Sequence, residues 1–435
     1  MTGVAITILV KDNSDTHKVL YHDIGDCLSR KEKLSILRNT SITDLNFKEL
    51  HIDEFGDWLN HRDKNYAKYP SLDNKGTKPL TLDRSIGFNT NRDAWDFNFS
   101  QKQLKSNVEK MIDNYNSQVQ DLFNEKDPLS KINLDEKFIS WSAGLKTKLK
   151  KRQNIIFNPK HIYETSFRPF TKKYVYYDKS LVERPGRFNK IMNQNDIVIY
   201  MPGVGGAKTF CALVTRGPVN LQGMGYASKT QTYPLCIKQD GLFEGQEILN
   251  INDSFSKLLP LDKEEIFPYI YALLNDPQFT NKYAAELQKD YPRIPPFKNA
   301  KKFAKIGKII MDLHLNYEKV PMYDKVKISN NGNDNYRVTR MKSYEDKGII
   351  IFNDNIEISN IPQKAYQYIV NGKSAIEWIV NQYQISQDKR SGIIDDPNEY
   401  SDDPKYIFNL LLRIINVSVQ TVDLINQLPP LEIEK

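Results

Sequence analysis

The sequence predicts an α+β fold, in which strands and helices occupy largely separate stretches of the chain. Short β-branched and aromatic runs gather between His161 and Ile237. Apolar residues recur at helical spacing from Gln101 to Phe123, and a second helical stretch from Asp262 to Asn316 is interrupted at prolines. Strands followed by helices, rather than a strict alternation of the two, are typical of this fold class.

The chain opens with a predicted hairpin. Thr2 to Val10 is a nearly continuous apolar run of the kind buried on both faces of a sheet, and Lys18 to Asp23 reads as a second strand after a polar turn. A short helix is expected from Arg30 to Arg38. Methyltransferase-type α/β sheets end in the same way, with a hairpin at the sheet edge followed by a helix. The sequence therefore reads as the back end of a longer protein, beginning inside a truncated sheet.

The later elements follow from periodicity, caps and prolines. Helices are expected over Gln101–Phe123 and over Lys137–Arg152. The stretch Asp262–Asn316 should be helical in three pieces, broken at Asp276-Pro277 and at Pro292 to Pro296. A further helix is expected to begin at Ser374, with Glu377 completing its cap, and a last helix should follow Asp403-Pro404. Strands are expected at Tyr174–Tyr177, Asp196–Tyr200 and Phe210–Thr215. These elements divide the chain into residues 1–60, a largely helical connector (61–155) and residues 156–435.

Composition limits the class of protein. An apolar fraction of 40%, with 24 Tyr and 20 Phe, is typical of a folded globular chain with several cores. The longest apolar run, Val4 to Val10, is far shorter than the ~20 residues of a membrane span, so no membrane partner is expected. The three cysteines lack metal or disulfide spacing, which predicts a reducing, cytoplasmic location.

Positive charge is concentrated in one part of the chain. Residues 146–190 contain thirteen Lys or Arg and only three acids, whereas the whole chain has a net charge of only +7. A local positive field within a nearly neutral chain is typical of a polyanion-binding face. A solvated, lysine-rich surface is the alternative interpretation.

Motifs for catalysis are weak or absent. Met201 to Thr209 (MPGVGGAKT) resembles a phosphate-binding loop but has Pro202 and Ala207 where that motif requires glycine. A predicted strand follows the loop, so a glycine-rich connection between two strands is the better interpretation. Neither a glycine-rich cofactor loop nor an N-P-P-Y-type tetrapeptide for a flipped adenine is found, and the E-x-K at Glu345 to Lys347 lacks the rest of a nuclease core. No two histidines have metal-ligand spacing, and His314 is predicted to be a satisfied core histidine.

Several ordered motifs together resemble the C-terminal part of the type ISP single-polypeptide restriction-modification enzymes. They are T-N-R-D-A-W (Thr90 to Trp95), F-R-P-F followed by Y-Y-D (Phe167 to Asp178), Y-P-L (Tyr233 to Leu235), Y-I-Y-A-L-L with K-Y-A-A-E-L-Q-K-D-Y-P-R-I-P (Tyr269 to Pro295), and D-L-H-L (Asp312 to Leu315). In that family a nuclease, a helicase-like translocase and an adenine-specific methyltransferase precede a target-recognition domain. The resemblance implies that residues 1–60 are the C-terminal edge of a methyltransferase domain and residues 156–435 a DNA target-recognition domain. It further implies that this chain recognises double-stranded DNA and adjoins those other domains. It also implies that the parent enzyme uses S-adenosylmethionine, ATP and Mg, while no cofactor, metal or catalytic residue is assigned to this chain.

The candidate DNA contacts are the cations and amides of polar loops that contain glycine or proline. They are Lys172, Lys173, Arg184, Arg187, Asn189, Lys190, Lys208, Gln222, Lys229 and Gln231. Lys172 and Lys173 are expected to contact phosphates, and Arg187 to read a base. Arg168 is expected to be a structural arginine paired with an acid. Two alternatives stay open: a self-contained nucleotide- or methyl-donor-binding enzyme that uses the Gly203–Thr209 loop, and a protein–protein docking module.

Overall fold

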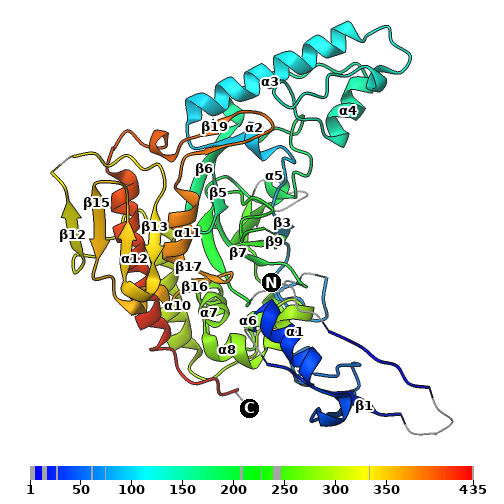
Figure 1. The fold of residues 1–435 in the computed structure, drawn as a ribbon, viewed down its shortest axis with the longest axis vertical. Coiled ribbons are helices and arrows are strands. Elements are labelled where there is room, and N and C mark those ends of the chain that lie inside the picture. Colours follow the sequence, from blue (N-terminus) through cyan, green and yellow to red (C-terminus); the bar gives the residue numbers. More distant parts are fainter. Residues whose placement is uncertain are drawn as a thin grey trace. The chain divides into compact units, whose positions relative to one another are not determined.

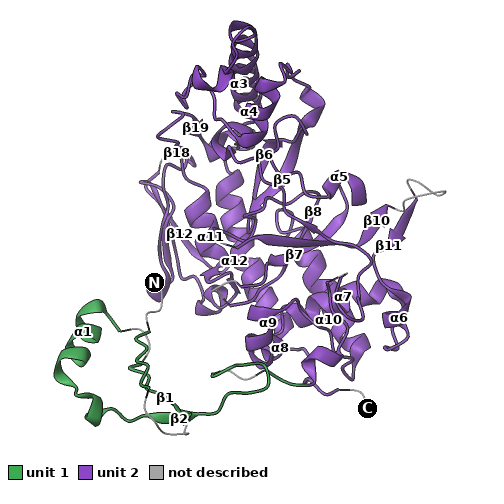
Figure 2. Ribbon diagram, turned by 90° about the vertical axis from the view of Figure 1, so that its right-hand side faces the viewer, with its two compact units in different colours: residues 1–64 green, residues 65–435 purple. Residues whose placement is uncertain are grey.

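The computed structural model describes residues 5–11, 17–25, 28–59, 62–73, 75–205, 209–226, 228–238, 246–332 and 334–433. The chain forms two compact units, residues 1–64 and 65–435 (Figure 2). The predicted boundary after residue 60 falls near this division. The predicted connector, 61–155, differs from the structure because its strands pair with later strands inside the larger unit.

The smaller unit contains little regular structure. Its elements are β1 (Val19–Tyr21), α1 (Arg30–Asn39), the 3-10 turn η1 (Ile42–Asp44) and β2 (Lys48–Leu50). The predicted helix is confirmed as α1, which begins with a capping box: the Glu32 backbone N–H donates to Ser29 Oγ, and the Ser29 N–H donates to the Glu32 carboxylate at 2.7 Å. Leu50 is the one buried apolar side chain among the described residues of this unit.

The predicted N-terminal hairpin is wrong for the residues that the structure describes. Residues 5–11 form no strand, and β1 pairs antiparallel with β2 instead. Ile8, Leu9 and Val10 are exposed. An apolar run of this kind is a stable strand only where neighbouring strands satisfy its backbone and both faces are covered, and the described residues of the unit supply neither. Thr2 to Val4 lie outside the described residues.

The larger unit contains three main sheets (Figure 1). One has the order β3-β9-β7-β8, with β3 (Ser85–Ile86), β9 (Thr230–Pro234), β7 (Ile197–Pro202) and β8 (Leu213–Arg216). The second has the order β4-β6-β5, with β4 (Phe97–Asn98), β6 (Thr171–Tyr176) and β5 (Ile162–Arg168). The third has the order β12-β15-β14-β13, with β12 (Lys327–Asn330), β15 (Ile356–Ser359), β14 (Ile349–Ile351) and β13 (Lys342–Tyr344). Two-stranded ribbons are β10 (Cys236–Lys238) with β11 (Glu247–Leu249), β16 (Ile369–Val370) with β17 (Lys373–Ser374), and β18 (Ser386–Gln387) with β19 (Ile394–Asp395).

Helices cover these sheets and form an arm. The α-helices are α2 (Asp93–Asp96), α3 (Gln101–Asp121), α4 (Ala143–Lys150), α5 (Phe188–Ile191), α6 (Asp253–Ser256), α7 (Lys263–Leu274), α8 (Pro277–Lys282), α9 (Ala284–Lys289), α10 (Ala300–Leu315), α11 (Ala375–Gln382) and α12 (Tyr406–Ile425). Short 3-10 turns are η2 (Tyr66–Lys68), η3 (Pro128–Ser130), η4 (Pro159–His161), η5 (Glu345–Lys347), η6 (Gln363–Tyr366) and η7 (Pro397–Glu399). The predicted α+β class is confirmed, and α3 with α4 forms a helical arm on the larger unit (Figure 1).

The buried apolar residues of the larger unit account for the spacing of apolar residues in its helices. One stripe of α3, containing Leu104, Val108 and Met111, is buried in the same apolar cluster as Leu145 and Leu149 of α4. The stretch from 262 to 316 forms four helices rather than the predicted three pieces, because the chain also turns between α8 and α9. Among the described residues, α12 has the length and composition of a membrane-crossing helix, but 56% of that window is buried inside the unit, as in a core helix.

His314 is a core histidine, as predicted. Its ring nitrogens lie within hydrogen-bond distance of two buried hydroxyls, with Nδ1 2.6 Å from Tyr271 Oη and Nε2 2.8 Å from Thr421 Oγ1. Burial lowers the pKa of His314 to about 3, because the charged imidazolium is disfavoured away from water. The ring is therefore neutral near pH 7 and joins α7, α10 and α12.

The T-N-R-D-A-W motif contains a buried carboxylate. The Asp96 and Arg92 side chains have no exposed surface, and Oδ2 lies 4.0 Å from Arg92 Nη1. Both carboxylate oxygens of Asp96 lack a hydrogen-bond partner. Burial raises the pKa of Asp96 to about 7, and the neighbouring guanidinium offsets only part of that effect. The carboxyl group therefore keeps its proton over a pH range in which an exposed aspartate is ionised.

We expect Asp96→Asn to change how stability depends on pH. Because the pKa in the folded state is higher than in the unfolded state, the contribution of Asp96 is fully present below pH ~4 and is lost as the pH rises toward ~7. Asparagine does not titrate, so the variant should gain stability relative to the parent as the pH rises over this range. Urea unfolding of both proteins at several pH values measures this difference. A difference that stays constant with pH would show that Asp96 is ionised throughout.

Candidate nucleic-acid interface

The cations of the basic segment, residues 146–190, fall into two groups in the structure: those paired with carboxylates and those exposed to solvent. Lys172 belongs to the paired group, because its Nζ lies 2.5 Å from a carboxylate oxygen of Glu318 and 3.0 Å from one of Glu164. Burial disfavours the ammonium ion, but the two carboxylates outweigh that cost and raise the pKa of Lys172. Tyr400 and Tyr406 donate to the same two glutamates, at 2.7 and 2.6 Å. This network joins the β5–β6 hairpin to α12.

Lys173 points into the protein from the neighbouring position. Its side chain is 10% exposed and its ammonium group is paired with Asp395, which also accepts the backbone N–H of Phe99 at 2.9 Å. The ammonium lies 4.4 Å from the Phe99 ring centroid and 4.2 Å from that of Phe167. This burial and pairing argue against the phosphate contacts expected of Lys172 and Lys173, because both ammonium groups already have close acidic partners.

Arg168 is buried as expected, but no carboxylate among the described residues lies within ion-pair distance of it, and Asp93 acts on its charge only from further away. Its guanidinium donates to the Phe167 carbonyl oxygen at 2.6 Å and to the side-chain oxygens of Asn220 and Gln222 at 3.4 and 3.3 Å. Only 1% of the residue is exposed, and burial lowers the pKa of Arg168. The arginine is held by neutral acceptors because it sits at the two-residue turn between β5 and β6, facing the amides of a neighbouring loop.

The two polar loops expected to face DNA are residues 182–194 and residues 220–231. The structure joins them through one extended segment, residues 85–89. On one side of this segment, Asn89 and Arg184 exchange backbone hydrogen bonds of 2.8 and 2.9 Å. On the other side, the Leu221 N–H donates to the Phe88 carbonyl at 2.7 Å. Residues far apart in sequence are thus fixed side by side by main-chain hydrogen bonds.

Two glycines permit this close approach. A Cβ atom at Gly87 would lie 2.6 Å from the Asn220 carbonyl oxygen. Gly186 has φ +63°, and a Cβ there would lie 2.7 Å from the Ile86 carbonyl oxygen. Backbone atoms cannot give way to a side chain at those distances, so both positions require glycine. The loops are therefore held in place by the backbone rather than by their exposed side chains.

The predicted contact residues differ in whether their side chains are exposed and whether they are paired with other side chains. Arg184, Asn189, Lys190 and Lys229 are exposed, and none forms an ion pair with another described residue. Arg187 is exposed too, but its guanidinium is paired with Asp83.

The two glutamines have partners of their own, and one predicted contact falls outside the structure. Gln222 accepts from Arg168, and the buried Gln231 accepts from Arg84 Nη1 at 2.7 Å. Lys208 lies outside the described residues. Base reading by Arg187 stays a prediction.

The glycine-rich loop connects two antiparallel strands, as expected. It follows β7 and leads to β8, whose register pairs Tyr200 with Leu213. The Gly203 N–H donates to the Lys229 carbonyl at 2.6 Å, which fixes the start of the loop against residues 220–231. Residues 209–212 are not helical, so the described part of the loop offers no helix N-terminus to a phosphate.

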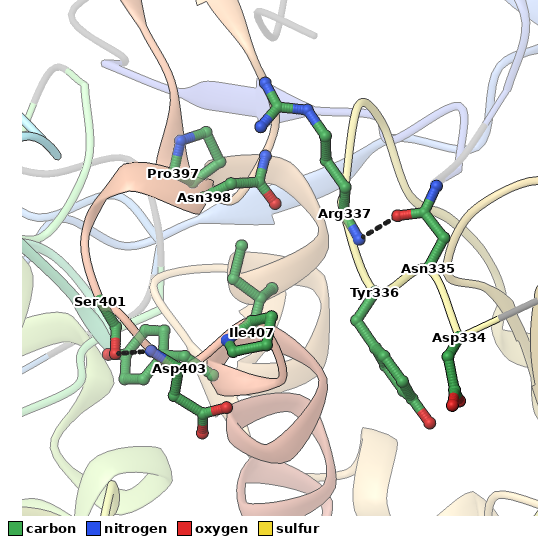
Figure 3. A pocket seen from close by; sticks show the side chains of 11 residues that line it. Asp334, Asn335, Tyr336, Arg337, Pro397, Asn398, Ser401, Asp403 and Ile407 are labelled. Carbon is green, nitrogen blue, oxygen red and sulfur yellow. Dashed lines mark hydrogen bonds between the residues drawn. The ribbon is translucent and has the colours of Figure 1, made fainter.

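A surface pocket of about 240 Å³ lies elsewhere in the larger unit (Figure 3). Most of its polar groups are already used by the loops that form it. Asn335 Oδ1 accepts the Arg337 backbone N–H at 3.0 Å, Ser401 Oγ accepts the Asp403 N–H at 3.1 Å, and the Arg337 guanidinium is paired with Asp396. No nucleophile–base pair is found among its lining residues. Over the described residues, no group of three or more potential metal ligands is found either.

Two features of this region were missed from the sequence. The first is the role of residues 85–89, which appear in the sequence as part of an aromatic loop but act as the support for both polar loops. The second is Tyr226, whose ring is 73% exposed at the tip of residues 220–231. The only local signal for it was one aromatic residue within a glycine-containing polar loop.

Comparison with known proteins shows which families and solved structures the chain is similar to. A sequence model of the Type ISP C-terminal specificity domain matches residues 81–410. A solved structure of a nuclease-deletion mutant of the Type ISP restriction-modification enzyme LlaGI, in complex with a DNA substrate mimic, is 39% identical, with a TM-score of 0.87 over 98% of this chain and 40% of that one. The ATP-dependent Type ISP enzyme LlaBIII bound to DNA is 35% identical, with a TM-score of 0.84 over 96% of this chain and 28% of that one.

A third structure, a complex of DrdV with DNA, is 25% identical, with a TM-score of 0.81 over 96% of this chain and 44% of that one. A search of curated proteins found no match. The chain thus spans less than half the length of these solved structures.

The fold and these similarities define the chain as a specificity domain of restriction-modification enzymes. It belongs to the Type ISP C-terminal specificity domain family, which confirms the resemblance drawn from its motifs.

Proposed function

We propose that residues 65–435 recognise a target sequence in double-stranded DNA on behalf of a restriction-modification enzyme. The observation that carries this proposal is the pair of polar loops, 182–194 and 220–231, fixed on either side of residues 85–89. They present the exposed cations Arg184, Lys190 and Lys229 from a rigid backbone. Cations position a protein on the phosphates, and arginine and amide side chains beside them can reach base edges. The DNA complexes of the similar enzymes support the same reading.

We propose a different role for residues 1–64. Ile6, Ile8, Leu9 and Val10 are between 66% and 90% exposed, and residues 5–11 pair with no strand among the described residues. An extended apolar segment with unpaired backbone groups can add to the edge of another sheet. This segment would join the sheet of an adjoining methyltransferase domain, and a translocase domain would precede that domain in the parent chain. The parent enzyme would then use S-adenosylmethionine, ATP and Mg.

We also propose that this chain catalyses nothing by itself and functions in the cytoplasm. The residues present do not fit a methyl donor or a nucleotide: the candidate loop has Pro202 at a required glycine, and a β-strand follows it. Isothermal titration of the chain with S-adenosylmethionine, and separately with ATP, tests this part of the proposal. Saturable heat with either ligand would favour the alternative of a self-contained enzyme.

Duplex binding tests the main proposal. A fluorescein-labelled duplex of mixed sequence should increase in anisotropy when the 435-residue chain is added, and log K should fall linearly with log salt concentration, with a slope of about −0.9 for each phosphate neutralised. Failure to bind at low salt, with the chain folded by circular dichroism, would contradict DNA recognition by this chain. It would then favour the protein-docking alternative.

A further inference from the structure

Tyr226 is an exposed aromatic ring on a constrained turn. Its exposed fraction is 73%, whereas most tyrosines of the larger unit are buried or half-buried. Within the turn, Gly223 N–H donates to the Asn220 carbonyl at 2.8 Å, and Gly225 N–H donates to the Gln222 carbonyl at 2.7 Å. The side chain of Met224, between these two glycines, is fully buried and anchors the turn in the core. The ring is therefore presented to solvent by a backbone that has little freedom to move.

The turn has no room to fold back against the protein. Gly225 has φ +104°, and a Cβ there would lie 2.9 Å from the Trp378 ring. Asn371 Nδ2 also donates to the Met224 carbonyl, which joins the turn to the β16–β17 ribbon. These contacts hold the turn on its inner side and leave the tyrosine ring on its outer side.

A buried positive charge lies directly beneath the ring. The Arg168 guanidinium carbon is 5.0 Å from the Tyr226 ring centroid and 4.0 Å from that of Phe167. No described carboxylate lies within ion-pair distance of Arg168, although Asp93 acts on its charge from further away and the Tyr226 side chain interacts with the guanidinium. An aromatic ring beside a buried cation that has no close carboxylate suits an electron-rich or anionic partner, because the positive field of the cation acts through the ring.

The loops on either side of this position carry an exposed cation and an exposed apolar side chain. Lys229 is exposed three residues further along the same loop. The start of the glycine-rich loop is bonded to that residue through Gly203, and Val204 beside it is 44% exposed. Proteins that bind nucleic-acid strands combine exposed aromatic rings, which stack on bases, with exposed cations, which meet the phosphates.

We propose that Tyr226 stacks against the face of a DNA base and holds that base step open, with Arg168 as the residue that positions the ring. This inference rests on the proposed DNA recognition and adds to it a stacking contact that deforms the duplex. Inserted or stacked side chains let a protein favour base steps that unstack easily, so the contact would contribute to specificity without reading a base edge.

Substitution of the ring tests the proposal in the 435-residue chain. Tyr226→Ala should weaken duplex binding by about 5- to 100-fold, the range found when a stacked aromatic ring is removed, while Tyr226→Phe should retain binding. Tyr344→Ala is the matched control, because Tyr344 is 43% exposed on β13 and lies outside the two loops. Since Tyr226 is an exposed side chain, circular dichroism should show both alanine variants folded.

Photo-crosslinking locates the contact. Duplexes that carry 5-iododeoxyuridine in place of thymidine should crosslink to the peptide containing Tyr226, in the parent and in Tyr226→Phe but not in Tyr226→Ala. Normal duplex affinity of Tyr226→Ala, or crosslinks only to other peptides, would overturn the stacking proposal and leave DNA recognition intact. If the parent chain binds no duplex at all, the proposed function fails first and this inference fails with it.

Discussion

Replacing Lys173 with glutamate is expected to destabilise the larger unit by about 3–5 kcal/mol, the cost of leaving a buried ion pair without its partner. The new carboxylate would face Asp395 and the ring faces of Phe99 and Phe167, all of which favour a cation in the structure. Urea unfolding followed by circular dichroism measures the change in the free energy of unfolding.

The control for this variant is Lys190→Glu, which makes the same change at an exposed position with no described acidic partner. It should alter the free energy of unfolding by less than about 0.5 kcal/mol. The competing hypothesis is that Lys173 contacts a phosphate. A Lys173→Glu variant of parental stability, with weakened binding to every duplex, would support that hypothesis and contradict the structural role.

Reversing the two free cations of residues 182–194 should have the largest effect on DNA binding. The double variant Arg184→Glu/Lys190→Glu is expected to weaken binding to all duplexes by about 10- to 100-fold at low salt and to reduce the salt slope by about 2, since two phosphate contacts are lost. Fluorescence anisotropy at several salt concentrations measures both quantities. The variant should keep parental stability, because both side chains are exposed.

The matched control is Lys150→Glu/Lys151→Glu. It makes the same change in net charge within the same basic segment, but at exposed lysines at the end of α4. A specific interface predicts a much smaller effect for this pair. Equal losses for the two double variants would mean that only the overall charge matters, and the assignment of residues 182–194 to the interface would be wrong.

Local signals in the sequence were sufficient for much of the fold. Ser29 and Glu32 form the cap that begins α1, and the apolar stripe of α3 is buried as its spacing predicts. The strands near Tyr174, Asp196 and Phe210 all exist as β6, β7 and β8, with ends shifted by a few residues. In each case the residues that determine the element are its own neighbours in sequence.

Long-range pairing was not predictable by the same means. Lys172 and Lys173 appear in the sequence as part of a basic run with few acids. Glu164 of that run pairs with Lys172, but the other carboxylates that engage the two lysines, Glu318 and Asp395, lie 146 and 222 residues away. Arg168 was expected to pair with an acid, since a buried charge usually does, and instead uses carbonyl and amide oxygens brought in by a neighbouring loop. Charge counted along the chain therefore overestimated the number of cations without an acidic partner.

The N-terminal hairpin failed for a related reason. The apolar run up to Val10 has the composition of a buried strand, but composition does not say which strand will pair with it. In the structure the partner of β1 is β2, about thirty residues further on. The run itself remains exposed over its described residues.

Selection from a library of duplexes with a randomised central region tests the central claim most directly. The 435-residue chain is mixed with the library, bound duplexes are recovered and amplified over several rounds, and the final pool is sequenced. Recognition of a target predicts that the pool converges on one short motif, and that the Arg184→Glu/Lys190→Glu variant binds this motif more weakly than the parent does. A pool that binds but remains random in sequence would contradict target recognition by this chain and reduce its role to non-specific attachment to DNA.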